Sequence, residues 1–230
     1  MKNTSFRLVI LAAAIIFIHN LVFTSPANGF VYWDEPNGSN AFFKWENGGS
    51  NSGLYGNPNI IGNTFSFSSI TNFEADSSEN PEVSDTLVFD LTANSGYLIT
   101  AIQISEGGDY DIVGDGSVNV LGELTIHNLA SSESDKVASL NFNPPMPVYS
   151  GHGNDANEWS GSATITGLNW THIKITLSND LFAIADEGSA SLIWKKSAGM
   201  PLTIQIVPEP ATIAILSIGL LALIKRKNKQ

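Results

Sequence analysis

The sequence of 230 residues contains no cysteine and has very little positive charge in its central part. Without cysteine, disulfide bonds, thiolate metal sites and a cysteine nucleophile are excluded. Six of the 11 basic residues lie near the two ends, so five lysines face 21 of the 22 acidic residues between them, a formal charge of about −16. Such a surface repels nucleic acid and attracts divalent cations. We therefore expect no nucleic-acid partner.

The familiar catalytic motifs are missing as well. The sequence has no Gly-x-Ser-x-Gly elbow, phosphate-binding loop or His-Glu-x-x-His motif. The three histidines beyond the first 27 residues, His127, His152 and His172, lack the spacing of zinc ligands. Carboxylates are numerous enough to supply a glycosidase pair, but composition alone accounts for their number. We expect no enzymatic activity and no cofactor.

Residues 1–27 follow the plan of a signal peptide. Two basic residues precede the apolar stretch 8–23, and small residues come directly after it. Cleavage after Ala27 or after Gly29 fits the small-residue pattern, and we predict that residues 1–27 are removed. The alternative is a retained membrane anchor. It is disfavoured because a turn-rich domain follows the cleavage pattern at once.

Residues 208–230 begin with Pro208, Glu209 and Pro210. Two prolines with one residue between them cannot lie inside a helix or continue a strand, so they form an extended, accessible spacer. The apolar run 211–224 would cover only about 21 Å as a helix, against a hydrocarbon core of about 30 Å. The basic cluster behind it should stay cytoplasmic. These features predict a short transmembrane helix that holds the precursor transiently, with the prolines just outside the membrane.

The Pro-Glu-Pro motif, short apolar span and basic end, in this order at the C-terminus, resemble the PEP-CTERM sorting tail recognised by exosortases. The resemblance implies that signal peptidase and then an exosortase process the chain, the latter at or near Pro208, Glu209 and Pro210. It also implies transient anchoring in the inner membrane, followed by transfer to the cell surface or extracellular matrix of a Gram-negative bacterium. The nucleophile would belong to the exosortase. An ordinary tail anchor is the alternative.

The part between these ends, residues 28–207, alternates apolar and polar residues with a period of two. The clearest runs are 87–91, 118–126, 173–177 and 202–206. Such runs, separated by glycine- and asparagine-rich turns, are typical of antiparallel strands with one buried face. We predict one acidic, all-β domain: an antiparallel β-sandwich, jelly-roll-like, of about eight to ten strands.

Two local predictions follow from the same reading. Gly107, Gly108 and Asp109 are read as a turn that divides the surrounding segment into two strands. Trp194 alternates in phase with Leu192 and is therefore predicted to lie in the core.

Asp109, Asp111 and Asp115 are weak candidates for a calcium site. They fall within seven residues of one another, and calcium prefers several closely spaced oxygen ligands. The EF-hand pattern is not met, however, because Val113 stands at the third ligand position. Turn aspartates are also common for purely structural reasons. The expectation is therefore no metal, with calcium as the alternative.

The polar, glycine-rich loop 150–158 is a second candidate. His152, Asp155 and Glu158 could be metal ligands or sugar-binding groups, although an ordinary long connection is the better explanation of the loop. Trp159 ends this loop and is the strongest candidate among the tryptophans for an exposed sugar-stacking platform. Aromatic residues of a sandwich more often lie in its core.

Together these features predict an exported, non-enzymatic cell-surface or extracellular-matrix protein. By the resemblance, it is sorted by exosortase and associated with exopolysaccharide or biofilm. One alternative is a carbohydrate-binding module with a calcium site, and the other is a secreted glycan hydrolase or lyase. The absence of a catalytic constellation favours the first over the last.

Overall fold

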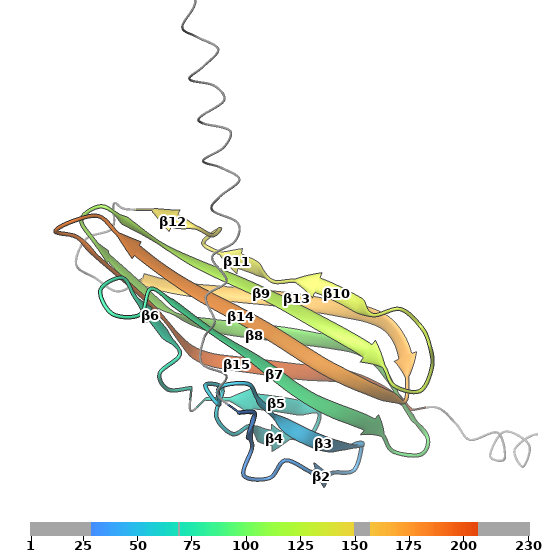
Figure 1. Ribbon diagram of the computed structural model, residues 1–230. Coiled ribbons are helices and arrows are strands. Elements are labelled where there is room, and N and C mark those ends of the chain that lie inside the picture. Colours follow the sequence, from blue (N-terminus) through green and yellow to red (C-terminus); the bar gives the residue numbers. More distant parts are fainter. Residues whose placement is uncertain (1–28, 69, 150–156, 207–230) are drawn as a thin grey trace, which may run out of the picture.

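The computed structural model describes residues 29–206 except 69 and 150–156. These residues form two antiparallel β-sheets that lie face to face as an elongated sandwich (Figure 1). The described residues contain no helix, and accordingly none that is long and apolar enough to cross a membrane. The predicted signal peptide and sorting tail lie outside the described residues. The predicted all-β class and antiparallel sandwich are confirmed.

Sheet A has eight strands, and its main path runs in the order β1-β3-β7-β14-β9-β10. β12 pairs with β9 and β2 pairs with β3 off this path. The strands are β1 (Val31–Tyr32), β2 (Gly38–Ser39), β3 (Phe43–Ser50), β7 (Glu82–Ala93), β9 (Gly116–Asn128), β10 (Lys136–Ser139), β12 (Val148–Tyr149) and β14 (His172–Ala185).

Sheet B has seven strands, in the order β11-β13-β8-β15-β5-β4, with β6 pairing with β15 off this path. The strands are β4 (Asn59–Ile61), β5 (Thr64–Phe67), β6 (Glu74–Asp76), β8 (Tyr97–Val113), β11 (Asn141–Asn143), β13 (Asn157–Trp170) and β15 (Ala190–Ile206). The predicted final strand, 202–207, corresponds to the end of β15, and residue 207 lies outside the described residues.

Eight of these strands form a nested set of antiparallel pairs. β9 pairs with β10, β8 with β13, β7 with β14 and β5 with β15, so that each pair encloses the one before it along the chain. Successive pairs alternate between the two sheets. This nesting is the topology of a jelly roll, to which β3 and several short strands add edges. Long-range pairing rather than local turns therefore holds the sandwich together.

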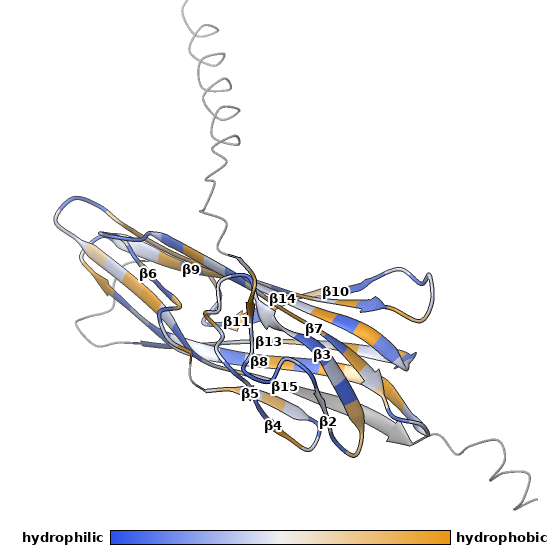
Figure 2. Cartoon of the chain, turned by 60° about the horizontal axis from the view of Figure 1, so that its bottom comes forward, coloured by the Kyte–Doolittle hydropathy of each residue, from blue (hydrophilic) through white to orange (hydrophobic). Residues whose placement is uncertain are grey.

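The core lies between the sheets and is built from the alternating residues of the long strands. The predicted apolar runs of β7, β9 and β14 all face inward, and their side chains are almost fully buried: Leu87, Phe89, Leu91, Val118, Val120, Leu124, Ile126, Ile173, Ile175 and Leu177. Figure 2 shows the matching alternation of hydropathy along β7 and β14. Burial of each such large apolar side chain stabilises the folded state by about 1.5–3 kcal/mol. Because of this gain, the apolar residues at every second position are the ones that face the core.

The Gly107-Gly108 pair does not form the predicted turn. β8 runs through both glycines without interruption, from Tyr97 to Val113. A Cβ atom on Gly108 would lie 1.9 Å from the carbonyl oxygen of Trp194 and 2.7 Å from the indole nitrogen of Trp159. Glycine is needed here because neighbouring groups approach the backbone closely, and not because the chain reverses.

At the start of β15 the inward and outward faces are the reverse of the prediction. Ser191, Ile193 and Lys195 are buried, whereas Trp194 is only half-buried. Trp194 therefore lies on the outer face of sheet B, where Nζ of Lys196 is 6.0 Å from its ring centroid. The hydrophobic pattern was misleading because a lysine, normally an outward residue, occupies an inward position of this strand.

Candidate functional site

A groove forms beside β9 where its neighbouring strand leaves sheet A. β10 pairs with β9 from Lys136 to Ser139, and β12 pairs with it again at Val148 and Tyr149. Between these pairings the chain crosses to sheet B and forms β11 against β13. In the described part of the chain, this crossing opens a hollow of about 660 Å³ along residues 119–123 of β9, which we call the β9 groove.

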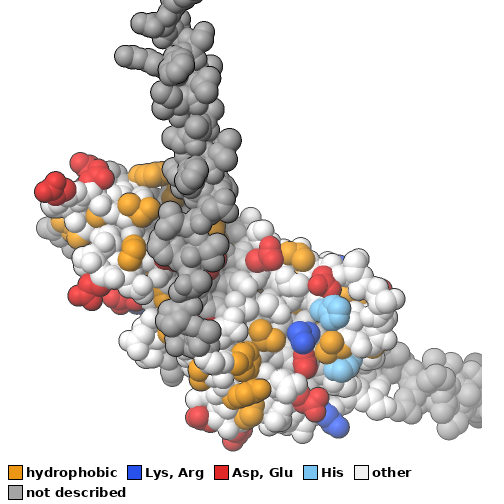
Figure 3. Space-filling model, viewed as in Figure 1, with side chains coloured by type: hydrophobic (Ala, Val, Ile, Leu, Met, Phe, Trp, Pro, Cys, Tyr) orange, Lys and Arg blue, Asp and Glu red, His pale blue; other side chains and the backbone are white. Residues whose placement is uncertain are grey.

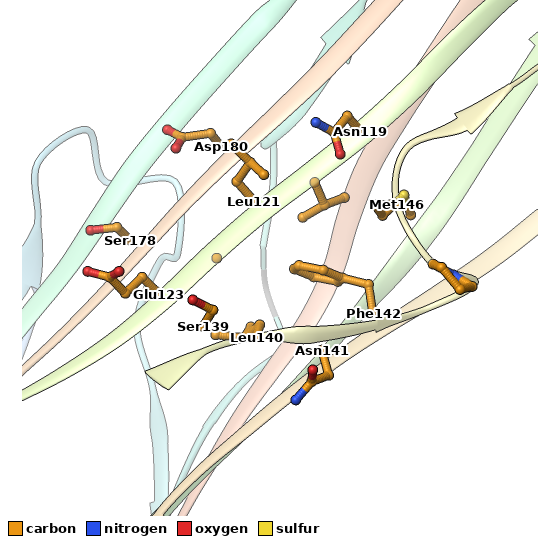
Figure 4. A pocket seen from close by; sticks show the side chains of 13 residues that line it. Asn119, Leu121, Glu123, Ser139, Leu140, Asn141, Phe142, Met146, Ser178 and Asp180 are labelled. Carbon is orange, nitrogen blue, oxygen red and sulfur yellow. The ribbon is translucent and has the colours of Figure 1, made fainter. Parts of the chain in front are cut away.

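The crossing segment is held beside β9 by a few specific contacts. The backbone N–H of Leu140 donates to the carbonyl oxygen of Gly122 over 2.8 Å. Phe142 extends from β11 toward β9 (Figure 4) and packs edge-on against Trp159, with ring centroids 6.1 Å apart. Two cis X-Pro bonds, Asn143–Pro144 and Met146–Pro147, lie in the segment that returns to β12. One wall of the groove is therefore this segment, and the other is the outer face of β9 and β14.

The end of the β9 groove next to β10 is polar. Ser178, Glu123 and Ser139 form one row across β14, β9 and β10, because each is paired with the next in the sheet register. Asp180 lies beside Leu121 in the adjacent row. Burial raises the pKa of the half-buried Asp180 carboxyl above its ordinary value of 3.8. This end offers hydroxyl and carboxylate groups for hydrogen bonding (Figure 4).

The other end is apolar. A second hollow of about 290 Å³ shares Asn119 and Leu121 with the first and continues toward β12. Its walls include Tyr149, Phe182 and Ile184. Tyr149 and Ile184 are 65% and 61% exposed, and Leu121, where the two hollows meet, is 50% exposed. Large apolar side chains that gather at this exposure in one hollow make it a candidate interaction surface.

The arrangement offers groups that can bind a polar, chain-like molecule. An apolar strip can contact the C–H faces of a sugar, and the hydroxyl, amide and carboxylate groups beside it can bind sugar hydroxyls. The two hollows form one continuous path along β9, which fits several linked units better than one compact molecule. On the face drawn in Figure 3, acidic side chains outnumber basic ones, which disfavours an anionic ligand.

The structure separates the three predicted calcium-site aspartates. Asp109 and Asp111 lie two positions apart in β8, and Asp115 lies beyond them next to the start of β9. Asp109 forms an ion pair with Lys196. The backbone N–H of Asp115 donates to Oγ of Ser189 over 2.9 Å. The described residues contain no group of three or more histidine, aspartate or glutamate side chains placed to hold a metal ion.

The predicted loop candidates are only partly described. His152 and Asp155 lie outside the described residues. Glu158 is exposed in β13, opposite Asp109 of β8. Trp159 is 2% exposed, so this candidate for an exposed stacking platform lies in the core instead, which was the other expectation for it. Its indole N–H donates to the carbonyl oxygen of Trp194 over 3.2 Å, which places the ring over Gly108.

The groove residues were not identified from the sequence, although one signal was present. Leu121 is a large apolar residue on the otherwise polar face of β9, which carries Ser117, Asn119, Glu123 and Thr125. An apolar residue out of phase in a clean alternation indicates a surface contact. The groove itself depends on the crossing segment, which no local pattern predicts.

No protein-family model and no curated protein matches the chain. Among solved structures, TmCBM61 in complex with beta-1,4-galactotriose is similar at 13% identity and a TM-score of 0.27, covering 76% of this chain and 98% of that one. The CBM3a-L domain of scaffoldin cipA from the Clostridium thermocellum cellulosome is similar at 15% identity and a TM-score of 0.27, covering 67% of this chain and 95% of that one. The structure of the infectious bursal disease virus Gx strain is similar at 12% identity and a TM-score of 0.26, covering 75% of this chain and 51% of that one. TM-scores this low establish neither a shared fold nor a shared ligand.

Proposed function

We propose that this chain is an exported, non-enzymatic surface protein whose β-sandwich binds polysaccharide along the β9 groove. The observation that carries the proposal is the continuous groove itself, with a polar end at Glu123 and Asp180 and an apolar end at Tyr149 and Ile184. The acidic surface favours a neutral or cationic glycan over an anionic one.

The place of action follows from the two ends of the chain. A signal peptide over 1–27 and an exosortase-recognised tail over 208–230 would deliver the domain to the cell surface or matrix, where the proposed partner is exopolysaccharide. Neither end lies in the described part of the structure, so the support for this part of the proposal is the sequence pattern alone. β15, a central strand of sheet B, ends at Ile206, two positions before the proposed tail, so a tail of this kind would attach the domain through this strand.

The test is binding of the full chain to a panel of neutral, cationic and anionic polysaccharides by affinity electrophoresis. Tyr149→Ala removes an exposed aromatic ring from the groove, and Leu121→Ser removes the apolar side chain where its two ends meet. Each should weaken binding of the preferred glycan about tenfold, which is about 1.4 kcal/mol.

The matched control is Tyr32→Ala, because Tyr32 is a tyrosine of similar exposure, 60%, in β1 at the opposite edge of sheet A. This variant should bind like the unmodified chain. Equal losses in Tyr32→Ala and Tyr149→Ala would place binding elsewhere, and no retention by any polysaccharide would refute the proposed function.

A further inference from the structure

Four polar side chains meet inside the apolar core, where each has little or no contact with solvent. Lys195 of β15 and Glu106 of β8 come from sheet B, and Asn179 of β14 comes from sheet A. Tyr55 reaches them from the connection between β3 and β4. Their exposed fractions are 2%, 5%, 0% and 0% in this order. A lysine is almost never buried so completely without a specific partner.

The contacts connect three of these groups in a closed ring. Nζ of Lys195 donates to Oε2 of Glu106 over 2.7 Å and to Oδ1 of Asn179 over 2.7 Å. Nδ2 of Asn179 donates to the other carboxylate oxygen, Oε1 of Glu106, over 2.8 Å. One carboxylate therefore contacts both the lysine amine and the amide nitrogen of the asparagine.

Tyr55 completes the arrangement from the side of the amide oxygen. Its hydroxyl donates a hydrogen bond to Oδ1 of Asn179. Burial, and then the negative charge of Glu106, raise the pKa of Tyr55 well above its ordinary value, so the hydroxyl keeps its proton. The connection that carries Tyr55 is held by Asp85, whose carboxylate accepts from the backbone N–H groups of Ser52 and Leu54 over 2.8 Å each.

The surroundings of the lysine amine are aromatic. Nζ of Lys195 lies 5.0 Å from the ring centroids of both Tyr55 and Phe73, and Phe73 is 1% exposed. Burial lowers the pKa of Lys195, although Glu106 acts in the opposite direction. In so dry a site the uncharged amine is favoured over the ammonium ion. A neutral amine is a nucleophile.

We propose that Lys195 and Asn179 form an intramolecular isopeptide bond, with Glu106 transferring the protons and Tyr55 stabilising the amide oxygen. The nucleophilic nitrogen already contacts Oδ1, which is one bond from the carbon that it would attack. Holding the two groups at this distance is the main requirement, because an amine and an unactivated amide react very slowly when they are not held together. The bond would connect β15 of sheet B to β14 of sheet A.

The reaction balances without any external reagent. Glu106 first takes a proton from the Lys195 ammonium group, and the freed amine then attacks Cγ of Asn179. The electron pair of the carbonyl moves to Oδ1, where the Tyr55 hydroxyl stabilises the developing charge. Glu106 next passes its proton to Nδ2 and accepts one from Nζ. The carbonyl re-forms, the bond between Cγ and Nδ2 breaks, and ammonia leaves, taking up the remaining proton as ammonium.

Digestion of the full chain with trypsin followed by tandem mass spectrometry tests the proposal. Without the bond, trypsin cuts after Lys174 and Lys195 and yields the peptide 175–195. With the bond, Lys195 is no longer a cleavage site. The expected product is the peptide 175–196, lighter by one ammonia molecule than its sequence mass, with fragments that show residues 179 and 195 joined.

Three variants distinguish the isopeptide bond from other reactions in which the chain loses ammonia. Lys195→Met keeps an apolar chain of similar length in the core and should retain the full mass. An asparagine that cyclises on its own backbone would still lose ammonia in this variant. Glu106→Gln keeps the shape but cannot cycle protons, so it should leave the two side chains unlinked. Lys196→Met, at the exposed neighbouring lysine, should leave the bond intact.

Circular dichroism melting of each variant confirms that it is folded, and Tyr55→Phe adds a mild change that keeps the ring. In Tyr55→Phe the bond should form more slowly. A folded wild-type chain that yields the unlinked peptide 175–195 after prolonged incubation would overturn the proposal, and Lys195 and Glu106 would then be a buried ion pair only. Persistence of the ammonia loss in folded Lys195→Met would overturn it as well.

Discussion

Gly108 of β8 lies directly against the carbonyl oxygen of Trp194 in β15, the same oxygen that accepts the indole N–H of Trp159. Three strands of sheet B meet at this glycine, because β8 pairs with β13 on one side and β15 on the other. β15 shifts register between Lys195 and Ser197, next to this contact. Lys195, which points into the core, is the residue of β15 paired with Gly108, so the close contact at Gly108 lies next to this buried lysine.

Gly108→Ala should destabilise the domain strongly. The added methyl group would lie far inside contact distance of backbone atoms, so strand β15 or the indole of Trp159 must move, at a cost of about 1–3 kcal/mol or more. Urea unfolding measures the loss. The control is Gly199→Ala in β15, where the nearest atom to an added Cβ lies 3.9 Å away. Comparable stability of the two variants would contradict the packing described here.

Asp180→Asn should make the domain more stable at neutral pH. The pKa of Asp180 is raised in the folded state by burial, so the folded chain binds more protons than the unfolded chain, whose aspartate titrates near 3.8. The unmodified domain therefore loses stability as the pH rises from the unfolded-state pKa through the higher folded-state pKa. The amide side chain has no such proton to lose, so the Asp180→Asn variant avoids this loss.

The advantage of Asp180→Asn should disappear below pH 3.8, where both states of the unmodified chain are protonated. Melting temperatures of the two chains across pH provide the measurement. Asp115→Asn, at an exposed turn, is the control and should not change the melting temperature at neutral pH. An Asp180→Asn variant that is less stable at neutral pH would show that the carboxylate makes a favourable contact instead.

Calcium should not change the melting temperature of the domain. The Asp109 carboxylate forms an ion pair with Lys196, and Asp115 lies beyond the end of β8. The three aspartates therefore do not form a common set of ligands. Titration with millimolar calcium during thermal melting tests this expectation, with magnesium as the control. A calcium-specific rise that is abolished in Asp111→Asn would establish the calcium site that the sequence left as an alternative.

The C-terminal tail should be absent from the mature protein. If an exosortase cuts at or near Pro208, Glu209 and Pro210, the surface-associated form ends there and lacks the apolar run 211–224. Mass spectrometry of protein from the native host identifies the terminus. Substitution of Glu209 by Ala should leave the tail attached and the protein in the membrane fraction. A mature chain that retains residues 213–230 would refute processing.

Local pattern was sufficient for much of the fold. In β7, β9 and β14, apolar residues at every second position are the buried residues, because both neighbouring strands and the facing sheet impose the same alternation. Phe65 and Phe67 of β5 follow the same rule. These strands, the antiparallel sandwich and the expectation of an all-β domain were therefore accessible from the sequence.

Where a residue is placed by distant partners, the same reasoning failed. Trp159 is buried because its indole crosses Gly108 and reaches the carbonyl oxygen of Trp194. Nothing near Gly107 in the chain indicates that the two glycines continue a strand. The β9 groove likewise arises because β11 crosses to sheet B, a pairing with β13 that no local pattern specifies.

The sequence by itself determined the acidic, cysteine-free composition and the inward faces of β7, β9 and β14, and it is the basis for the predicted processing signals at the two ends. Only the tertiary structure decided that Lys195 points into the core, where Glu106 and Asn179 lie 89 and 16 positions away along the chain. The physical reason is that hydrophobic alternation is a property of one strand. Burial of a charged group depends instead on partners that other strands supply, since only their hydrogen bonds and opposite charge offset the cost of removing it from water.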